Sequence, residues 1–306
     1  MEDTQKSMEE IATVVATYSR EMSLKFASGE TVRARIKGKK LKPVCGDLVR
    51  AQPLENEPEW LITDVLTRSN ELTRPNQRGQ VEVLAANLEF LCVVAASTPT
   101  PDWFIVDRYL SAAEFMGIDA AVVYNKFDLD TNTALAGDML GEYRDIGYST
   151  LQCSAKTGKN IDQLLSMLAG KTSIIVGQSG VGKSSLINEL TDGVELRIGR
   201  ISSATGEGKH TTVNSSMIDL KNGGRVIDSP GVRDYAPAIT RGDNIVVGFR
   251  EIADAGQSCR FANCHHLKEP GCEVKRKVEA GEISQRRYES YRRLIVVTEQ
   301  LTKPRH

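Results

Sequence analysis

Residues 177–184 read GQSGVGKS, and a short apolar stretch at 173–176 comes directly before them. They match the phosphate-loop pattern G-x-x-x-x-G-K-[ST], in which glycines let backbone N–H groups close around phosphate oxygens. Residues 185–190 have helical spacing, and the dipole at a helix N-terminus favours bound anions. The stretch therefore predicts a strand, a loop and a helix within a nucleotide-binding α/β sheet.

Within this loop, Lys183 is expected to reach the β- and γ-phosphates, and Ser184 offers a hydroxyl to Mg²⁺. The residues expected to contact phosphate are Gly177, Gln178, Ser179, Gly180, Val181, Gly182, Lys183, Ser184 and Ser185.

A second motif, Asn125-Lys126-Phe127-Asp128, follows an apolar stretch at 118–124 and selects the base. A carboxylate at Asp128 can accept hydrogen bonds from N1 and the exocyclic N2 of guanine, which adenine cannot supply. Lys126 can lay its stem over the base, and Asn125 can brace the loops. The segment Ser154-Ala155-Lys156 supplies the other base-side loop.

The order of these motifs is unusual because the base loop precedes the phosphate loop, whereas an ordinary GTPase has them in the opposite order. The order indicates a circularly permuted GTPase. Apolar strands alternate with helices, and the motifs follow the C-terminal ends of the strands. This pattern predicts a parallel sheet that binds its ligand along the edge formed by those ends.

The segment Asp228-Ser229-Pro230-Gly231 follows apolar residues 226–227. It supplies an aspartate for Mg²⁺ and, at Gly231, an N–H for the γ-phosphate. Between the two phosphate motifs lies Lys209-His210-Thr211-Thr212, and we favour Thr212 over Thr211 as the Mg²⁺ ligand. The expected magnesium set is Ser184, Thr212 and Asp228.

The residue after the Asp-x-x-Gly motif is Val232, where many GTPases have a glutamine that orients water. An apolar side chain cannot orient water, so we expect slow intrinsic hydrolysis that a partner accelerates. His210 is the candidate catalytic replacement, because imidazole can orient or deprotonate water. A structural or partner-contacting histidine is the alternative.

Cysteines cluster near the C-terminus in the spacing Cys-x4-Cys-x-His-x5-Cys, formed by Cys259, Cys264, His266 and Cys272. Three thiolates and one imidazole suit tetrahedral Zn²⁺ and leave no position open for reactive water, which predicts one structural zinc ion. His265 competes with His266 as the ligand, and spacing alone does not choose between them.

Short strand-like segments separated by turns fill residues up to about 70 and predict a five-stranded OB-type barrel. Such barrels bind oligonucleotides, although a barrel that only packs against its neighbour is the alternative.

Two basic regions favour contact with nucleic acid, against the alternative of solvated faces. They contain Arg33, Arg35, Lys37, Lys39, Lys40 and Lys42, and then Lys275, Arg276, Lys277, Arg286, Arg287, Arg292 and Arg293.

With 306 residues, 26% charged residues and a net charge of -1, the chain has room for several domains and the composition of a soluble protein. No signal pattern or membrane-spanning apolar run is present, so we expect a cytoplasmic protein, and we favour a monomer. The expected architecture is multidomain: an OB-type barrel at 1–70, a permuted α/β P-loop GTPase at 71–240, and a mostly helical zinc domain at 241–306.

The permuted order, the phosphate loop, the His210-Thr211-Thr212 segment, DSPGVR from Asp228 and the cysteine–histidine set together resemble the RsgA family. The resemblance covers essentially the whole chain. It implies a GTPase that binds the maturing small (30S) ribosomal subunit and its rRNA, with GTP hydrolysis stimulated by the subunit. It also implies the guanine, phosphate and zinc residues named above, with His210 as the catalytic histidine. Residues between 197 and 210 match the family least well.

Three hypotheses follow. The first is a GTPase that acts as a late checkpoint in small-subunit assembly, cycling between GTP and GDP. The second is an RNA-binding module whose affinity is set by GTP, and the third is a regulator of mature subunits. An ATP-driven helicase is disfavoured by Asp128 and by the absence of a second motor domain.

Overall fold

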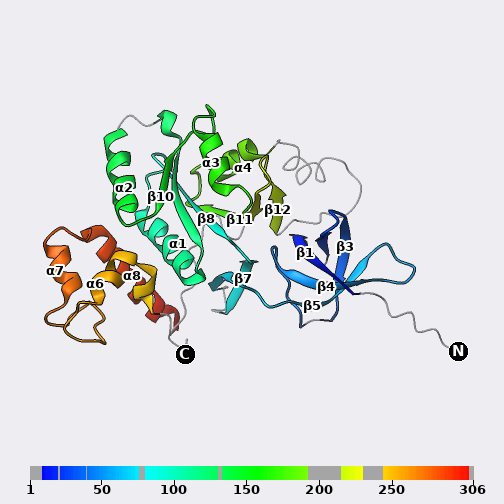
Figure 1. Ribbon diagram of the computed structural model, residues 1–306, viewed down its shortest axis with the longest axis horizontal. Coiled ribbons are helices and arrows are strands. Elements are labelled where there is room, and N and C mark those ends of the chain that lie inside the picture. The colour runs from blue at the N-terminus through cyan, green and yellow to red at the C-terminus, as the bar shows by residue number, and fades with distance from the viewer. Residues whose placement is uncertain are drawn as a thin grey trace.

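The computed structural model describes residues 9–19, 21–38, 40–75, 80–129, 133–191, 215–229 and 244–302. They form a barrel, a central α/β part and a helical C-terminal module, arranged in a row with the central part in the middle (Figure 1). This order along the chain confirms the predicted fold class. None of the helices in these ranges is both long and apolar enough to span a membrane.

The N-terminal part is a closed five-stranded barrel in the order β1-β2-β3-β5-β4, with β4 returning to β1. Its strands are β1 (Glu10–Thr17), β2 (Met22–Phe26), β3 (Thr31–Ile36), β4 (Leu48–Pro53) and β5 (Trp60–Val65). Buried and half-buried residues alternate along β2, as a strand with one face on a core requires. Val14, Leu24 and Ile62 have no exposed surface and lie in that core. The closed order is that of the predicted OB-type barrel.

The central sheet has five parallel strands in the order β10-β9-β8-β11-β13. They are β8 (Phe90–Ala96), β9 (Asp119–Asn125), β10 (Ser149–Gln152), β11 (Thr172–Gly177) and β13 (Arg225–Asp228). An antiparallel strand that the sequence did not predict, β12 (Ser215–Asp219), follows β13 in the sheet. Every residue of β8 is buried because the sheet is covered on both faces.

Helices α1 and α2 cover one face of this sheet, and α3 and α4 cover the other (Figure 1). Their bounds are α1 (Trp103–Met116), α2 (Thr133–Asp145), α3 (Ile161–Leu168) and α4 (Lys183–Leu190). Successive residues of β8 enter opposite cores: Leu91 and Val93 pack with α1 and α2, whereas Cys92 and Val94 pack with α3 and α4. Both layers follow from the alternating side-chain direction of a strand.

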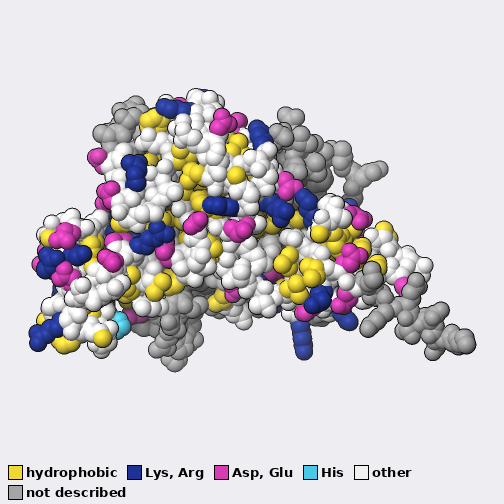
Figure 2. All heavy atoms as spheres, viewed as in Figure 1, with side chains coloured by type: hydrophobic (Ala, Val, Ile, Leu, Met, Phe, Trp, Pro, Cys, Tyr) yellow, Lys and Arg dark blue, Asp and Glu magenta, His cyan; other side chains and the backbone are white. Residues whose placement is uncertain are grey.

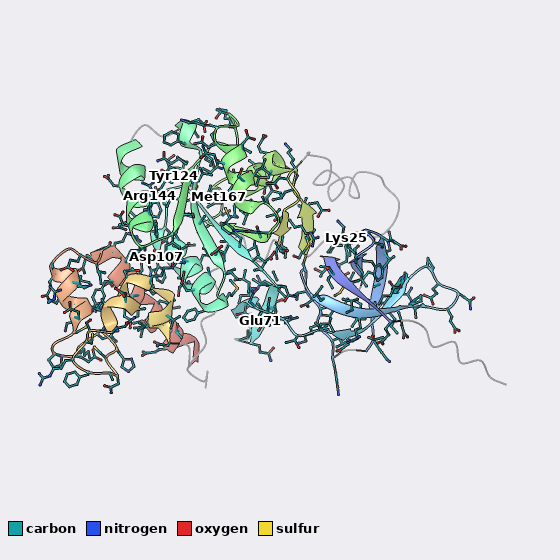
Figure 3. All side chains as sticks on the ribbon, in the orientation of Figure 1. Lys25, Glu71, Asp107, Tyr124, Arg144 and Met167 are labelled. Carbon is teal, nitrogen blue, oxygen red and sulfur yellow. The ribbon has the colours of Figure 1, made fainter. Side chains whose placement is uncertain are left out.

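The barrel and the central sheet are one continuous sheet. The first half of β1 pairs with β4 inside the barrel, and its last residues pair with β12, with Thr17 opposite Ser215. Lys25 of β2 forms an ion pair with Asp219 of β12 at 2.6 Å, and Figure 3 shows Lys25 on the side of the barrel next to β12. Eleven strands therefore hydrogen-bond without interruption.

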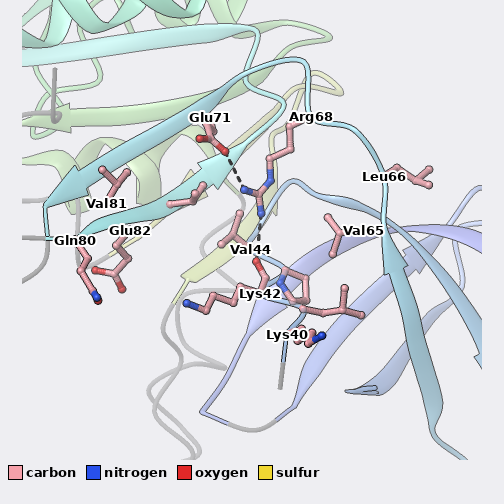
Figure 4. Close-up of a pocket in the computed structure, with 13 residues that line it drawn as sticks. Lys40, Lys42, Val44, Val65, Leu66, Arg68, Glu71, Gln80, Val81 and Glu82 are labelled. Carbon is pink, nitrogen blue, oxygen red and sulfur yellow. Dashed lines mark hydrogen bonds and ion pairs between the residues drawn. The ribbon is translucent and has the colours of Figure 1, made fainter. Parts of the chain in front are cut away.

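A hairpin that the sequence did not predict connects the barrel to β8. It is formed by β6 (Glu71–Pro75) and β7 (Val81–Ala86). Arg68, at the base of the hairpin, forms an ion pair with the fully buried Asp47 at 2.8 Å. It also donates a hydrogen bond to the Lys42 carbonyl oxygen. Arg68 and Lys42 line a pocket between barrel and hairpin, and Lys40 is a further lining residue (Figure 4).

The C-terminal module has its own apolar core, built by η3 (Ile245–Gly248), α6 (Arg250–Gly256), α7 (Glu273–Glu279) and α8 (Gln285–Thr302). Phe249 and Tyr291 meet edge to face in it, with ring centroids 5.5 Å apart. Phe104 of α1 belongs to the same core, so the module packs directly on the central part.

Gly46 lies at the seam between barrel and hairpin, and we predict that Gly46→Ala destabilises the protein. Its φ is +95°, and a β-carbon there would lie 2.1 Å from the Ala86 carbonyl oxygen. Gly29 is the matched control, with φ +90° and nothing within 4 Å. Gly29→Ala should lower the free energy of unfolding by about 1 kcal/mol, because of backbone strain. Gly46→Ala should cost about 2 kcal/mol more, because the backbone must shift. Equal losses in thermal unfolding would contradict this packing.

Candidate nucleotide and metal sites

The predicted phosphate loop joins β11 to α4. Gly177, Gly180 and Gly182 all have positive φ, at 136°, 81° and 94°, which favours glycine at each. A β-carbon at Gly177 would lie 2.1 Å from the carbonyl oxygen of Val94, and one at Gly182 would lie 2.4 Å from Nδ2 of Asn125. The loop therefore closes against β8 and against the predicted base loop only with glycine at these positions.

Lys183 opens α4 and is almost fully buried. Its Nζ donates to the carbonyl oxygens of Gly177 and Gln178 at 2.6 and 2.8 Å, which holds the ammonium inside the loop. Ser184 and Ser185, in the first turn of α4, are exposed, as is Ser179 in the loop. A cation, free hydroxyls and a helix N-terminus thus share one loop, which suits a phosphate chain.

Asn125 ends β9 and joins three loops. Its side chain has no exposed surface. Nδ2 donates to the Val181 carbonyl oxygen at 3.0 Å, and Oδ1 accepts from the Ala155 amide at 3.1 Å. The predicted base loop, the phosphate loop and the Ser154-Ala155-Lys156 segment are therefore bonded through one buried amide.

Lys126 has φ +61° and crosses from the base loop to the phosphate loop. Its Nζ donates to the carbonyl oxygens of Thr98 and Gly180 at 2.8 and 2.6 Å. Asp128 is exposed, and its Oδ1 accepts from the Ser154 hydroxyl at 2.6 Å. Ser154 is buried, so it orients a carboxylate that faces solvent, and Lys156 beside it is exposed.

Asp228 ends β13, next to β11 in the sheet, so it lies at the same edge as the phosphate loop. His210, Thr211, Thr212, Gly231 and Val232 lie outside the described residues.

The loop between β8 and α1 also contacts the phosphate loop, which the sequence did not predict. Gln178 Oε1 accepts from the backbone N–H of Asp102 at 3.2 Å, and Pro99 lies against Gly180. Asp102 caps α1 by accepting from the Phe104 amide. An Asp before an apolar helical stretch is a recognisable N-cap, but its partner on the phosphate loop is visible only in the folded chain.

Cys259, Cys264, His266 and Cys272 form a cluster whose ligand atoms all lie within 4.8 Å of one another. His266 Nδ1 is 3.5 Å from the sulfurs of both Cys259 and Cys272. His266 is buried, whereas His265 is exposed, so the structure selects His266 between the two candidates. Three sulfurs and one nitrogen at these separations can surround a single metal ion.

Groups around the cluster hold its loop in place. Tyr288 and Tyr291 of α8 donate their hydroxyls to the carbonyl oxygens of His266 and His265 at 2.6 and 2.9 Å. Glu269 accepts backbone bonds from its own N–H and from those of His265, Leu267 and Lys268, which lower its pKa to about 2. The loop is therefore held by two tyrosines of α8 and by a carboxylate of its own.

One expectation about charge is wrong. The prediction that Arg286 and Arg287 belong to a basic region that meets RNA does not hold, because Arg287 has only 1% of its side chain exposed and Arg286 has 25%. Both bond to Asp107 of α1, which has no exposed surface, at 2.7 and 2.9 Å. These arginines instead attach the C-terminal module to the central part.

Comparison with known proteins agrees with this geometry. The RsgA GTPase family model matches residues 65–237, more than half of the chain. A small ribosomal subunit biogenesis GTPase RsgA from Ectopseudomonas mendocina (strain ymp) is 40% identical over 270 residues, covering 88% of this chain and 78% of that protein. The protein of the same name from Haemophilus influenzae (strain 86-028NP) is 38% identical over 298 residues, covering 96% and 86%.

Two solved structures share the whole architecture. YjeQ from Thermotoga maritima superposes with a TM-score of 0.75 at 30% identity and covers 97% of this chain and 100% of that one. YloQ, described as a circularly permuted GTPase, superposes with a TM-score of 0.73 at 25% identity and covers both chains completely.

The adjacent histidines provide a test of the metal cluster. We predict that His266→Ala lowers the metal content of the purified protein and the thermal stability of the C-terminal module, because one of four ligands is lost. His265→Ala should change neither, since its ring lies outside the cluster. Metal analysis and thermal unfolding of both variants provide the measurement. Equal metal content in the two variants would contradict the assignment.

Proposed function

The chain belongs to the RsgA GTPase family and is a GTP hydrolase, and from this premise we propose that it acts in ribosome assembly. Specifically, it binds the small (30S) subunit late in maturation, and contact with that subunit stimulates hydrolysis of GTP to GDP. Relatives at about 40% identity carry the name small ribosomal subunit biogenesis GTPase. GTP hydrolysis then serves as the checkpoint that separates the protein from a completed subunit.

The observation that carries the nucleotide part of this proposal is the buried amide of Asn125, bonded to both the phosphate loop and the Ser154-Ala155-Lys156 segment. It holds a base-reading loop and a phosphate loop together although the chain presents them in reverse order. We assign guanine recognition to Asn125, Lys126 and Asp128, with Ser154 orienting Asp128.

Phosphate binding is assigned to residues 177–185, with Lys183 exchanging its carbonyl partners for phosphate oxygens. The exposed hydroxyl of Ser184 and the carboxylate of Asp228 at the neighbouring strand end suit Mg²⁺, together with Thr212. When bound, Mg²⁺ neutralises charge that develops on the transferred phosphoryl group. His210 is proposed to orient the attacking water when the small subunit is bound, because Val232 cannot.

Zinc is proposed for the Cys259, Cys264, His266 and Cys272 cluster, as a single structural ion. All four ligands come from the protein, which leaves no position open for a reactive water. The ion then stabilises a module whose core is small.

We propose that the barrel and the C-terminal module contact rRNA, with functional boundaries near residues 70 and 240. Lys40 and Lys42 line the pocket beside the barrel and are available to phosphate groups. Figure 2 shows lysine and arginine side chains spread among acidic ones across the visible face, so specific positions rather than overall charge would guide docking. A monomer acting in the cytoplasm completes the proposal.

Base selection can be tested by Asp128→Asn. An asparagine amide donates where the carboxylate accepts, so it suits xanthine, which has a carbonyl at C2, better than guanine. Loss of charged hydrogen bonds should weaken GTP binding about 10- to 100-fold and raise the affinity for xanthosine triphosphate. Asp162→Asn, at an exposed aspartate in the first turn of α3, is the control. Unchanged preference for GTP in Asp128→Asn would remove Asp128 from the site.

The central experiment measures GTP hydrolysis by the pure protein alone, with small ribosomal subunits, and with large subunits as control. We expect small subunits, but not large subunits, to stimulate GTP hydrolysis strongly. We also expect His210→Ala to lose this stimulation while it retains GTP binding. Intact GTP binding without stimulation would overturn subunit-activated catalysis and favour an RNA-binding module controlled by GTP.

A further inference from the structure

The N-terminus of helix α1 contacts the phosphate loop. Gln178 Oε1 accepts from the Asp102 amide at 3.2 Å, directly before the first turn, and Pro99 packs on Gly180. Lys126 adds a bridge between the carbonyl oxygens of Thr98 and Gly180. The first turn of α1 and the phosphate loop are therefore connected by hydrogen bonds and packing, so displacement of one changes the position of the other.

The same turns of α1 are held from the opposite side by the C-terminal module. Phe104 is part of the core of that module, and the guanidinium of Arg293 lies 4.1 Å from the centroid of its ring. One turn further, Asp107 accepts from Arg286 and Arg287 of α8 at 2.7 and 2.9 Å. Figure 3 labels Asp107 on the side of the central part that faces this module.

Two similar clamps attach α1 to the module. The proximal clamp joins Asp107 to Arg286 and to the Tyr143 hydroxyl (2.8 Å), and the Arg286 guanidinium lies 5.2 Å from the ring centroid of Tyr143.

The distal clamp joins Glu114 to Arg250 at 2.8 Å and to the Tyr148 hydroxyl at 3.0 Å, with the Arg250 guanidinium 4.1 Å from the ring centroid of Tyr148. Each clamp contains a carboxylate of α1, an arginine of the module and a tyrosine that bonds to that carboxylate. The two lie seven residues apart, about 10 Å along the helix. Only the proximal clamp is close to the phosphate loop.

We propose that Asp107 is a positioning residue for the bound nucleotide. It fixes the first turns of α1 to the C-terminal module, and the Gln178 contact passes that position to the phosphate loop. Displacement of the module, as when a partner binds it, then changes how tightly the phosphate loop holds guanine nucleotide. The inference rests on the proposed function in that the loop must bind such a nucleotide.

The test compares Asp107→Asn with Glu114→Gln in the full-length protein. Both changes remove one charge and preserve side-chain shape. In Asp107→Asn, Arg286 keeps Glu142 and Arg287 keeps Glu251 as charged partners, so neither arginine is left unpaired. We expect release of a fluorescent GDP analogue to accelerate about fivefold or more in Asp107→Asn but to change less than about twofold in Glu114→Gln. The KM for GTP should rise while kcat stays nearly constant.

A second set of variants, made in Gln178→Ala, distinguishes a positioning role of Asp107 from a general loosening of the protein. Gln178→Ala removes the hydrogen bond to which the proposal assigns the coupling and leaves only the Pro99 and Lys126 contacts, so adding Asp107→Asn should accelerate GDP release less than it does in the unmodified protein. Additive effects, or equal release rates in folded Asp107→Asn and Glu114→Gln, would overturn the inference. Failure of the unmodified protein to bind the GDP analogue would instead overturn the proposed nucleotide site.

If Asp107→Asn does not fold, the exposed Arg293 supplies the alternative. Arg293→Ala removes the nearer of two cations at the Phe104 ring and leaves the Arg108 guanidinium 5.6 Å from its centroid, and the neighbouring exposed Arg292 is its control. Faster GDP release in Arg293→Ala than in Arg292→Ala supports the connection through α1, and equal release contradicts it.

Discussion

The buried amide of Asn125 is the contact on which the proposed nucleotide site depends, because it joins loops from three separate strands at one edge of the sheet. Neither Val181 nor Ala155 is near Asn125 in the chain. Parallel strands bring their carboxyl ends to one edge whatever their order in sequence. This explains how a permuted chain builds the site: hydrogen bonding in space is unchanged when the base loop precedes the phosphate loop.

Both flanking parts attach to the central part beside this site. The barrel shares its sheet through β12, which pairs with β1 on one edge and with β13, ending at Asp228, on the other. The C-terminal module attaches through α1, whose N-cap contacts the phosphate loop. The barrel is joined by backbone hydrogen bonds, whereas the module is joined by buried ion pairs and aromatic packing. These attachments bring both parts next to the loops that we propose to bind the nucleotide.

Much of the site was predictable because its chemistry is local in sequence. The glycines of the phosphate loop, Lys183, Asp128 and the cysteine spacing each indicate their proposed role through residue type and short-range order. Long-range partners could not be read in this way. Arg287 looks like a surface cation in a basic helix, yet it is buried because Asp107 and Glu251 lie opposite it in the fold. The β6–β7 hairpin was missed, although its strand β7 ends in an apolar run.

The sequence by itself therefore determined the three-part architecture and the permuted order of the motifs, and it supplied the residues that we propose for the nucleotide and metal sites. Only the tertiary structure showed that His266 is buried in the cluster while His265 is exposed, placed Gln178 against Asp102, and placed Arg286 and Arg287 in an interface instead of on an RNA-binding surface. The physical reason is that motif chemistry is fixed by neighbours along the chain. Burial and the charge of the opposing side chain are fixed by elements distant in the chain, as with Asp107, which is 180 residues from Arg287, and these decide whether an arginine meets solvent or a carboxylate.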